Sequence, residues 1–188
     1  MKKIKGYIRT KELSAIGITG IDIKRLCDEG RLLRIQHGLY RDAGMFMQNQ
    51  SFIDISVAYP KAVITGPSAL VYYGLTTFMP HKVHIAFLRN SNIPKIEYPP
   101  IEISWVSKPF FELGITEVKQ GKYSFRIYNM ERAVCEAFRY RNKLGIDMAK
   151  EALTEYMRRK DKNIAKLYEM AQKCKVKKIM EPWMMAMI

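Results

Sequence analysis

The spacing of apolar residues in the first quarter of the chain predicts two short helices followed by a basic β-hairpin. We expect Thr10 to cap a first helix over residues 11–16, because its hydroxyl can accept a hydrogen bond from a free backbone N–H group, and Gly17 to end that helix. Residues 31–41 alternate polar and apolar side chains around a central His-Gly pair, which is typical of two strands joined by a turn.

The second predicted helix follows the first after a three-residue turn. Thr19 caps it, and Asp22 stands three residues later, which is a short form of the capping box and places a negative charge at the positive end of the helix. Gly30 suits the position just after the last turn. Apolar residues at helical spacing form the inward face: Ile23, Leu26 and Cys27. Helix, turn, helix and hairpin in this order predict a winged helix-turn-helix over residues 1–44.

The remaining residues, 45–188, are expected to form a larger mixed α+β domain that ends in a helical bundle, so that the whole chain belongs to the α+β class. After a linker over residues 45–50, helical spacing predicts helices at residues 51–59, from residue 66, from residue 130, at residues 147–159 and at residues 163–173. Strands are predicted at residues 61–65, 82–88, 101–106, 115–119 and 123–128, the last two joined by a hairpin turn. The final apolar segment, residues 182–188, is expected to pack on this domain or to form a surface for a partner.

Positive charge is concentrated in two regions of the chain. The sequence has 32 Lys+Arg and 18 Asp+Glu, a net charge of +14. Residues 1–44 contain ten basic and five acidic residues, a net +5, and residues 139–178 contain thirteen and five, a net +8. Residues 45–138 are close to balance, with nine and seven. A positive excess of this size favours a polyanionic partner, either nucleic acid or an acidic protein.

Composition excludes several classes of protein. Hydrophobic residues make up 48% of the chain, which is enough for a packed core and excludes a disordered chain. The sequence has no apolar run of about 18 residues, so we expect no membrane span, and no apolar segment follows the basic first residues as in a secretory signal. The three cysteines are far apart and form no Cys-x-x-Cys motif, which favours reduced thiols in the cytoplasm over disulfides or zinc.

Known catalytic motifs are also absent from the sequence. There is no Walker loop, no dinucleotide fingerprint and no paired-aspartate motif of the kind that nucleotidyltransferases need, and Ser68 does not stand in a nucleophile elbow. His81 and His84 are three residues apart, and on a strand this spacing points the two side chains to opposite faces. We therefore expect no enzyme, no catalytic residue, no metal and no cofactor.

The winged helix predicts which residues contact DNA. A helix fits the major groove with its N-terminal, outward side chains on the base edges, while a basic hairpin lies along the backbone or the minor groove. Asp22 stands on the same face, where phosphates would repel it, unless it turns back as a cap. The alternative is a small helical domain whose basic residues are only solvated. The candidate DNA-binding residues are Thr19, Gly20, Lys24 and Arg25 on the second helix, and Arg31, Arg34, Gln36 and His37 on the hairpin.

Several blocks of the sequence resemble the AbiEi-like type IV antitoxins of abortive-infection systems. The blocks that resemble the family's N-terminal winged helix are residues 10–13, 17–18, 23–26, 29–32, 35 and 37–41. Residues 60–75 resemble the next block, a short strand followed by a Ser-Ala-Leu-x-x-x-Gly-Leu helix, and residues 127–137 and 140–145 resemble the C-terminal helix. One departure is the short segment before Thr10, since winged helices usually open with a longer first helix. Residues 2–9 are expected to supply either a strand or no element.

The resemblance implies a non-enzymatic antitoxin that also represses its own transcription. The winged helix would bind an inverted repeat in the promoter, and the C-terminal domain would counteract a nucleotidyltransferase-like toxin, directly or indirectly. The basic residues expected to carry that second role are Arg139, Arg141, Lys143, Arg158, Arg159, Lys162, Lys173 and Lys177. Two other interpretations of these residues are a solvated helical surface and an RNA- or tRNA-binding surface, the latter making the chain an RNA-binding protein.

Overall fold

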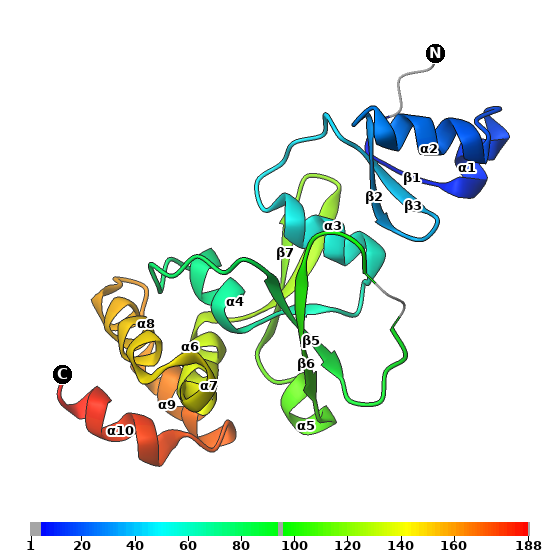
Figure 1. The fold of residues 1–188 in the computed structure, drawn as a ribbon. Coiled ribbons are helices and arrows are strands. Elements are labelled where there is room, and N and C mark those ends of the chain that lie inside the picture. Colours follow the sequence, from blue (N-terminus) through cyan, green and yellow to red (C-terminus); the bar gives the residue numbers. More distant parts are fainter. Residues whose placement is uncertain (1–4, 94–95, 188) are drawn as a thin grey trace.

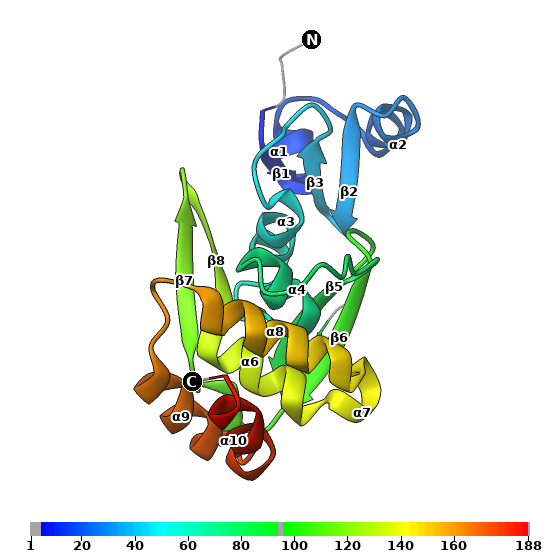
Figure 2. The same ribbon diagram turned by 90° about the vertical axis from the view of Figure 1, so that its left-hand side faces the viewer.

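The structure, a computed structural model, describes residues 5–93 and 96–187 and contains two units of unequal size (Figure 1). The smaller, N-terminal unit has an antiparallel sheet in the order β1-β3-β2, and the larger unit has a mixed five-stranded sheet in the order β6-β5-β4-β8-β7. The small unit and the C-terminal helices lie at opposite ends of the molecule (Figure 1, Figure 2). The predicted α+β architecture is confirmed.

The N-terminal unit is a helix-turn-helix followed by a β-hairpin wing, as predicted. Its elements are β1 (Tyr7–Arg9), α1 (Thr10–Ala15), α2 (Gly20–Asp28), β2 (Leu32–Gln36) and β3 (Leu39–Asp42). The unit has a small core of its own, formed by Leu13, Ile23, Leu26, Leu32 and Tyr40. Strand β1 adds a third strand beside β3, so residues 7–9, directly before α1, take part in the wing sheet.

Three of the four predicted helix boundaries in this unit are confirmed and one is wrong. Gly17 follows the end of α1 with a φ of 83°, as expected for the residue that ends the helix. The Thr19 hydroxyl accepts from the backbone N–H of Asp22 at 3.3 Å, and the Asp22 carboxylate accepts from that of Thr19 at 3.1 Å, which completes the capping box. Gly30 follows the last turn of α2 with a φ of 66°, a left-handed conformation that suits glycine. Thr10, however, does not cap α1. Arg9 occupies the cap position because β1 runs directly into the helix, and the Glu12 carboxylate accepts from its N–H at 2.6 Å.

The larger unit places its helices mainly on one face of its sheet. The elements are α3 (Gln50–Ala58), β4 (Val63–Ile64), α4 (Gly66–Tyr72), β5 (Val83–Leu88), β6 (Ile101–Val106), α5 (Lys108–Phe111), β7 (Ile115–Gln120), β8 (Tyr123–Tyr128), α6 (Met130–Arg139), α7 (Arg141–Leu144), α8 (Ile146–Arg158), α9 (Ile164–Lys173) and α10 (Lys177–Met185). Strand β4 pairs in parallel with β8, and β5 with β6, while β4–β5 and β7–β8 are antiparallel. The strand predicted at residues 61–65 contains only two strand residues.

Consecutive residues of the central strands face opposite sides of this sheet, as strand geometry requires. One side faces the main core beneath the helices and includes Ile64, Ile85 and Ile127. The other side faces a smaller cluster completed by Phe111 of α5 and includes Val63, Ala86 and Tyr128. Residues on both sides of the central strands are therefore buried, which is why apolar residues stand at consecutive positions in β4 and in the middle of β5.

Helix α6 forms the centre of the C-terminal bundle, with α8, α9 and α10 packed around it (Figure 2). The final apolar segment packs partly on the domain, because Met184 is buried on α10 while Met185 is 72% exposed. Within the described residues, none of the helices is long and apolar enough to cross a membrane.

The two units meet in a buried polar cluster between the wing sheet and α3. The Asp54 carboxylate accepts hydrogen bonds from the Tyr7 hydroxyl and, at 3.0 Å, from the Gln50 amide. Arg41 of β3 pairs with the same carboxylate oxygen at 2.9 Å. Tyr7 faces the core of the larger unit, whereas its neighbour Ile8 faces the core of the smaller one, so β1 contributes to both. The division of the chain at residues 44 and 45 stays a prediction.

Candidate nucleic-acid interface

The outer face of α2 carries Lys24 and Arg25, two of the residues predicted to contact DNA. Helical periodicity places Ile21, Lys24 and Arg25 on one side of α2, opposite the buried Ile23 and Leu26. All three outer side chains are exposed. The helix is fixed at its start by the Thr19–Asp22 capping box and on its inner side by the small core. The face is thus presented to solvent on a rigid support.

Asp22 is turned back toward the start of its own helix. Hydrogen bonds from the Thr19 side chain and backbone, together with the nearby Arg25 guanidinium, hold the pKa of the Asp22 carboxyl below its usual value. The Nη2 atom of Arg25 lies 2.9 Å from Asp22 Oδ1. The charge that seemed to oppose phosphate binding is therefore engaged by a cap and by a neighbouring cation, as a capping role requires.

The basic residues of this face differ in how strongly they are paired. Arg25 also lies 3.9 Å from a Glu29 carboxylate oxygen, and Arg31 lies 3.5 Å from the other oxygen of Glu29. Lys24 is exposed, and no carboxylate of the described residues forms an ion pair with it. Ion pairs as exposed as these contribute little to stability, so a phosphate can replace the carboxylate with little loss of free energy.

A loop of the larger unit lies along the outer edge of the wing. The backbone N–H groups of Glu97 and Tyr98 donate to the Ile35 carbonyl of β2 at 3.2 and 3.1 Å. Arg34 Nη2 lies 3.1 Å from Glu97 Oε1 and 3.2 Å from the Nδ1 atom of His37 at the hairpin tip. Gln36 is half-buried and its Oε1 atom is buried without a hydrogen-bond partner. Gln36 therefore lies at the boundary with the larger unit, and its contact with DNA stays a prediction.

The structure brings together most, but not all, of the residues predicted to contact DNA. Seven of the eight are exposed on the N-terminal unit: Thr19, Gly20, Lys24, Arg25, Arg31, Arg34 and His37. Gln36 lies against the larger unit instead. The sequence interpretation missed Ile21, which is 84% exposed on the same face as Lys24 and Arg25. The helical spacing of these three residues was a signal that could have found it.

The N-terminal segment of the chain matches a known protein family. Residues 2–41 match the family model described as "Transcriptional regulator, AbiEi antitoxin". The match spans the helix-turn-helix and almost the whole wing, so the suspected AbiEi resemblance is confirmed for this segment. No curated protein matches the chain.

Beyond the AbiEi segment, the predicted C-terminal basic residues are engaged within the chain. Several side chains bind backbone carbonyl groups: Arg139 that of Cys174, Arg141 that of Phe138, Arg159 that of Tyr73 and Lys162 that of Met157. Others pair with carboxylates: Lys143 with Glu102, Arg158 with Glu155, Arg159 with Asp161 and Lys173 with Glu169. Lys177 lies over the Tyr168 ring at 4.3 Å. Much of this charge serves the fold of the helices.

These C-terminal residues also fall into separate groups. Arg141 and Lys143 precede α8 in the chain, and Arg159 and Lys162 follow it. Because α8 has 13 residues, its two ends are about 20 Å apart. The basic residues therefore do not form one continuous patch, and a partner that contacts all of them would have to cover both ends of the bundle.

A small polar cavity near His84 lacks the features of a catalytic site. Its volume is about 70 Å³, and it is lined by Thr65, Gly66, Pro67, His84, Ser104, Glu136, Tyr140, Lys143 and Leu144. Glu136 is occupied by Arg132, by the Thr65 hydroxyl and by the Gly66 N–H at 3.2 Å. The Ser68 hydroxyl accepts a hydrogen bond from the His84 N–H at 2.9 Å, so it joins α4 to β5. Within the described residues, no group of three or more His, Cys, Asp or Glu side chains could hold a metal ion.

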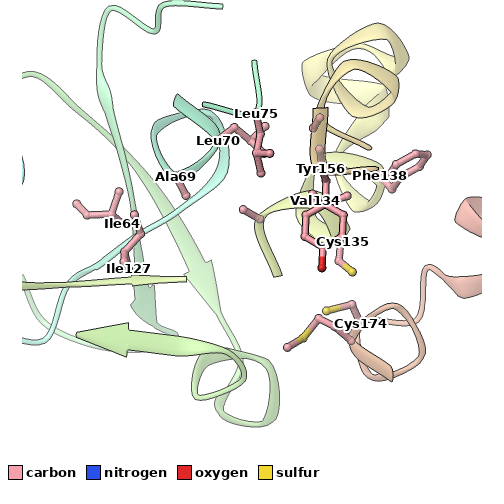
Figure 3. Close-up of a cluster of buried hydrophobic side chains, with 14 of the residues drawn as sticks. Ile64, Ala69, Leu70, Leu75, Ile127, Val134, Cys135, Phe138, Tyr156 and Cys174 are labelled. Atoms are coloured by element: carbon pink, nitrogen blue, oxygen red, sulfur yellow. The ribbon is translucent and has the colours of Figure 1, made fainter. Parts of the chain in front are cut away.

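Two thiols are buried between α6 and the end of α9. Cys135 and Cys174 lie in the core of the bundle beside Tyr156 (Figure 3). A hydrogen bond from Cys135 and the nearby Arg132 guanidinium lower the pKa of Cys174 to about 7. The Nη1 atom of Arg132 lies 3.1 Å from Cys174 Sγ. Both thiols are enclosed by the bundle, so they act as core residues that complete the surroundings of the buried arginine.

Proposed function

We propose that this chain is a transcriptional regulator that binds duplex DNA through its winged helix, and that it serves as an antitoxin of an abortive-infection system. The observation that carries the proposal is the exposed outer face of α2, with Lys24 and Arg25, inside the segment that matches the AbiEi regulators. A rigid helix with cations on its exposed side suits the major groove of DNA.

The two parts of the winged helix have different roles in this proposal. The N-terminal half of α2 enters the major groove, where side chains reach the base edges. Arg31, Arg34 and His37 lie along the hairpin and contact phosphates or the minor groove, which positions the helix but reads little sequence. The DNA site proposed is an inverted repeat in the chain's own promoter, so that binding represses its own transcription.

The larger unit carries the antitoxin role in this proposal. It counteracts a nucleotidyltransferase-like toxin, either by direct contact or through an indirect effect. The support is the order of sequence blocks at residues 60–75, 127–137 and 140–145, which resemble the family beyond the segment that the family model matches. The internal pairing of the basic C-terminal residues favours DNA as the nucleic-acid partner over an RNA held by that surface.

Replacement of Lys24 and Arg25 with alanine tests the DNA role. Binding of the promoter duplex, followed by fluorescence anisotropy across a salt series, is expected to weaken at least about tenfold, and the slope of log K against log salt to fall by about 2. The matched control replaces Lys119 and Lys160, two exposed lysines of the larger unit, with the same loss of charge. Equal weakening in both double variants would show that only net charge matters and would contradict the proposed interface.

Two further measurements separate the roles of the two units. Competition between promoter duplex and tRNA at fixed salt tests the nucleic-acid partner, and a preference for tRNA would contradict the DNA role. Rescue of cells that express the toxin should survive the Lys24→Ala/Arg25→Ala change, because that change leaves the larger unit intact. Loss of rescue with DNA binding retained would contradict the proposed division of roles.

A further inference from the structure

The side chain of Ile21 is exposed at a position where an apolar residue gains nothing from the fold. It is 84% exposed in the first turn of α2, whereas Ile23, two residues later, is buried in the small core. An exposed aliphatic side chain is common by itself. What distinguishes Ile21 is its place on the one helix face that also carries Lys24 and Arg25.

The surroundings of Ile21 leave it open to a partner and hold it in place. The capping box of Thr19 and Asp22 fixes the backbone of the first turn. Gly20 precedes Ile21, and a Cβ atom added there would meet no atom of the described residues within 4 Å, so the space beside Gly20 is open in the part of the chain that the structure describes. Ile21 lies one helical turn before the cations Lys24 and Arg25. This arrangement is complementary to a partner surface that has apolar groups next to negative charges.

The DNA major groove is such a surface. Thymine presents its C5 methyl group there, between the phosphates of the two strands, and apolar side chains read it by direct contact. Contacts from Lys24 or Arg25 to phosphates would supply affinity but carry no sequence information. The first turn of a recognition helix is the part that approaches the bases most closely.

We infer that Ile21 is a specificity-determining residue that reads a thymine methyl group in the major groove. This inference rests on the proposed DNA role of the winged helix. It assigns sequence discrimination at one base pair to an apolar contact, while Lys24 and Arg25 hold the helix in the groove through the phosphates.

The test combines a change in the protein with a change of one methyl group in the DNA. The full chain is measured against the promoter duplex and against duplexes in which each thymine of the protected site is replaced in turn by deoxyuridine, which lacks only the methyl group. For the unchanged chain we expect one such position per half-site to weaken binding about fourfold, the effect of removing one buried apolar carbon. Ile21→Ala should weaken binding to the thymine duplex by a similar factor and respond no further to deoxyuridine at that position.

A second variant, Ile16→Ala, controls for the loss of an exposed isoleucine outside the DNA-facing side of α2. Ile16 is 43% exposed in the turn before α2, outside the outer face, so Ile16→Ala should keep the full response to deoxyuridine. If the unchanged chain binds no promoter DNA, the proposed function itself fails. If it binds but responds to no deoxyuridine, or if Ile21→Ala retains the response at the same position, the assignment of Ile21 is overturned while the DNA role stands.

Discussion

Arg41 of β3 and Asp54 of α3 form an ion pair across the junction of the two units, with 2.9 Å between Nε and Oδ1. The Arg41 side chain is 7% exposed and that of Asp54 is fully buried. Burial raises the pKa of Asp54, and the Tyr7 hydroxyl, Arg41 and Gln50 oppose that shift by binding the carboxylate. The winged helix is thus joined to the larger unit by a desolvated charge pair as well as by the chain.

Loss of the charge on Asp54 should strongly destabilise the protein. Asp54→Asn leaves the Arg41 guanidinium buried without a counter-ion, and breaking a buried pair in this way costs about 3 kcal/mol or more. Unfolding in guanidinium chloride measures the change. Asp28→Asn, an exposed aspartate on α2, is the matched control and should shift the free energy of unfolding by less than about 0.5 kcal/mol. Equal effects of the two changes would show that the junction contributes no special stability.

The ion pair between Arg132 and Glu136 inside α6 should contribute more to stability than the hydrogen bond from Thr65 to the same carboxylate. Glu136→Gln leaves the buried Arg132 without a counter-charge and should cost about 3 kcal/mol. Thr65→Val keeps the shape of the side chain but removes its hydrogen bond to Glu136, which should cost about 1 kcal/mol. Urea unfolding of both variants gives the comparison. A larger effect at Thr65 than at Glu136 would contradict the view that the charge pair dominates.

The elements that depend on local signals could be predicted from the sequence. The capping box of Thr19 and Asp22 and the left-handed Gly30 each depend on residues within one helical turn, and both form as expected. Helix α5 was missed because four residues are too few to show a periodic pattern. Strand β1 has only three residues, and for the same reason the sequence left open either a strand or no element before Thr10.

Contacts between distant parts of the chain could not be predicted in this way. Tyr7 and Asp54 meet although 47 residues separate them, and no local pattern marks either as a partner of the other. Glu97 reaches Arg34 through a loop whose path depends on the whole sheet. The sequence also predicted an open basic surface in the C-terminal third, because it does not show these long-range contacts. In the structure Arg139 binds the Cys174 carbonyl and Lys143 binds Glu102.

The stability of the protein should depend on the protonation of His84. Burial lowers the pKa of His84 below its usual 6.5; nearby Lys143 and Lys82 lower it further, and Glu102 on the adjacent strand raises it. Below pH 6.5 the unfolded chain therefore binds a proton that the folded chain resists, so stability falls as the pH falls through this range.

His84→Gln removes this proton linkage. For one group the slope of the free energy of unfolding cannot exceed about 1.4 kcal/mol per pH unit. We expect urea unfolding at about pH 5.5 and about pH 7.5 to show a smaller difference in stability for the variant than for the unchanged chain. An unchanged or larger difference in the variant would assign the pH dependence to other groups.

The contact between Glu97 and Arg34 should weaken DNA binding, and its removal should strengthen it. Glu97 holds the Arg34 guanidinium at 3.1 Å and places a negative charge beside the wing. Both side chains are partly exposed, at 42% for Arg34 and 38% for Glu97, so Glu97→Gln should change stability by less than about 1 kcal/mol. It frees Arg34 for a phosphate and removes a repulsive charge, and we expect tighter binding of the promoter duplex by about twofold to fivefold at low salt, with a smaller gain at high salt.

Two variants show whether that gain depends on Arg34. Glu112→Gln removes an exposed carboxylate on the larger unit and controls for net charge. Adding Arg34→Ala to Glu97→Gln should abolish the gain, because the freed guanidinium is then gone. Anisotropy titrations of the four proteins under one salt series decide between two roles of Glu97. If Glu97→Gln binds DNA more weakly than the unchanged chain, the carboxylate serves to hold the wing in its binding geometry, and Arg34 is engaged by the protein instead of the DNA.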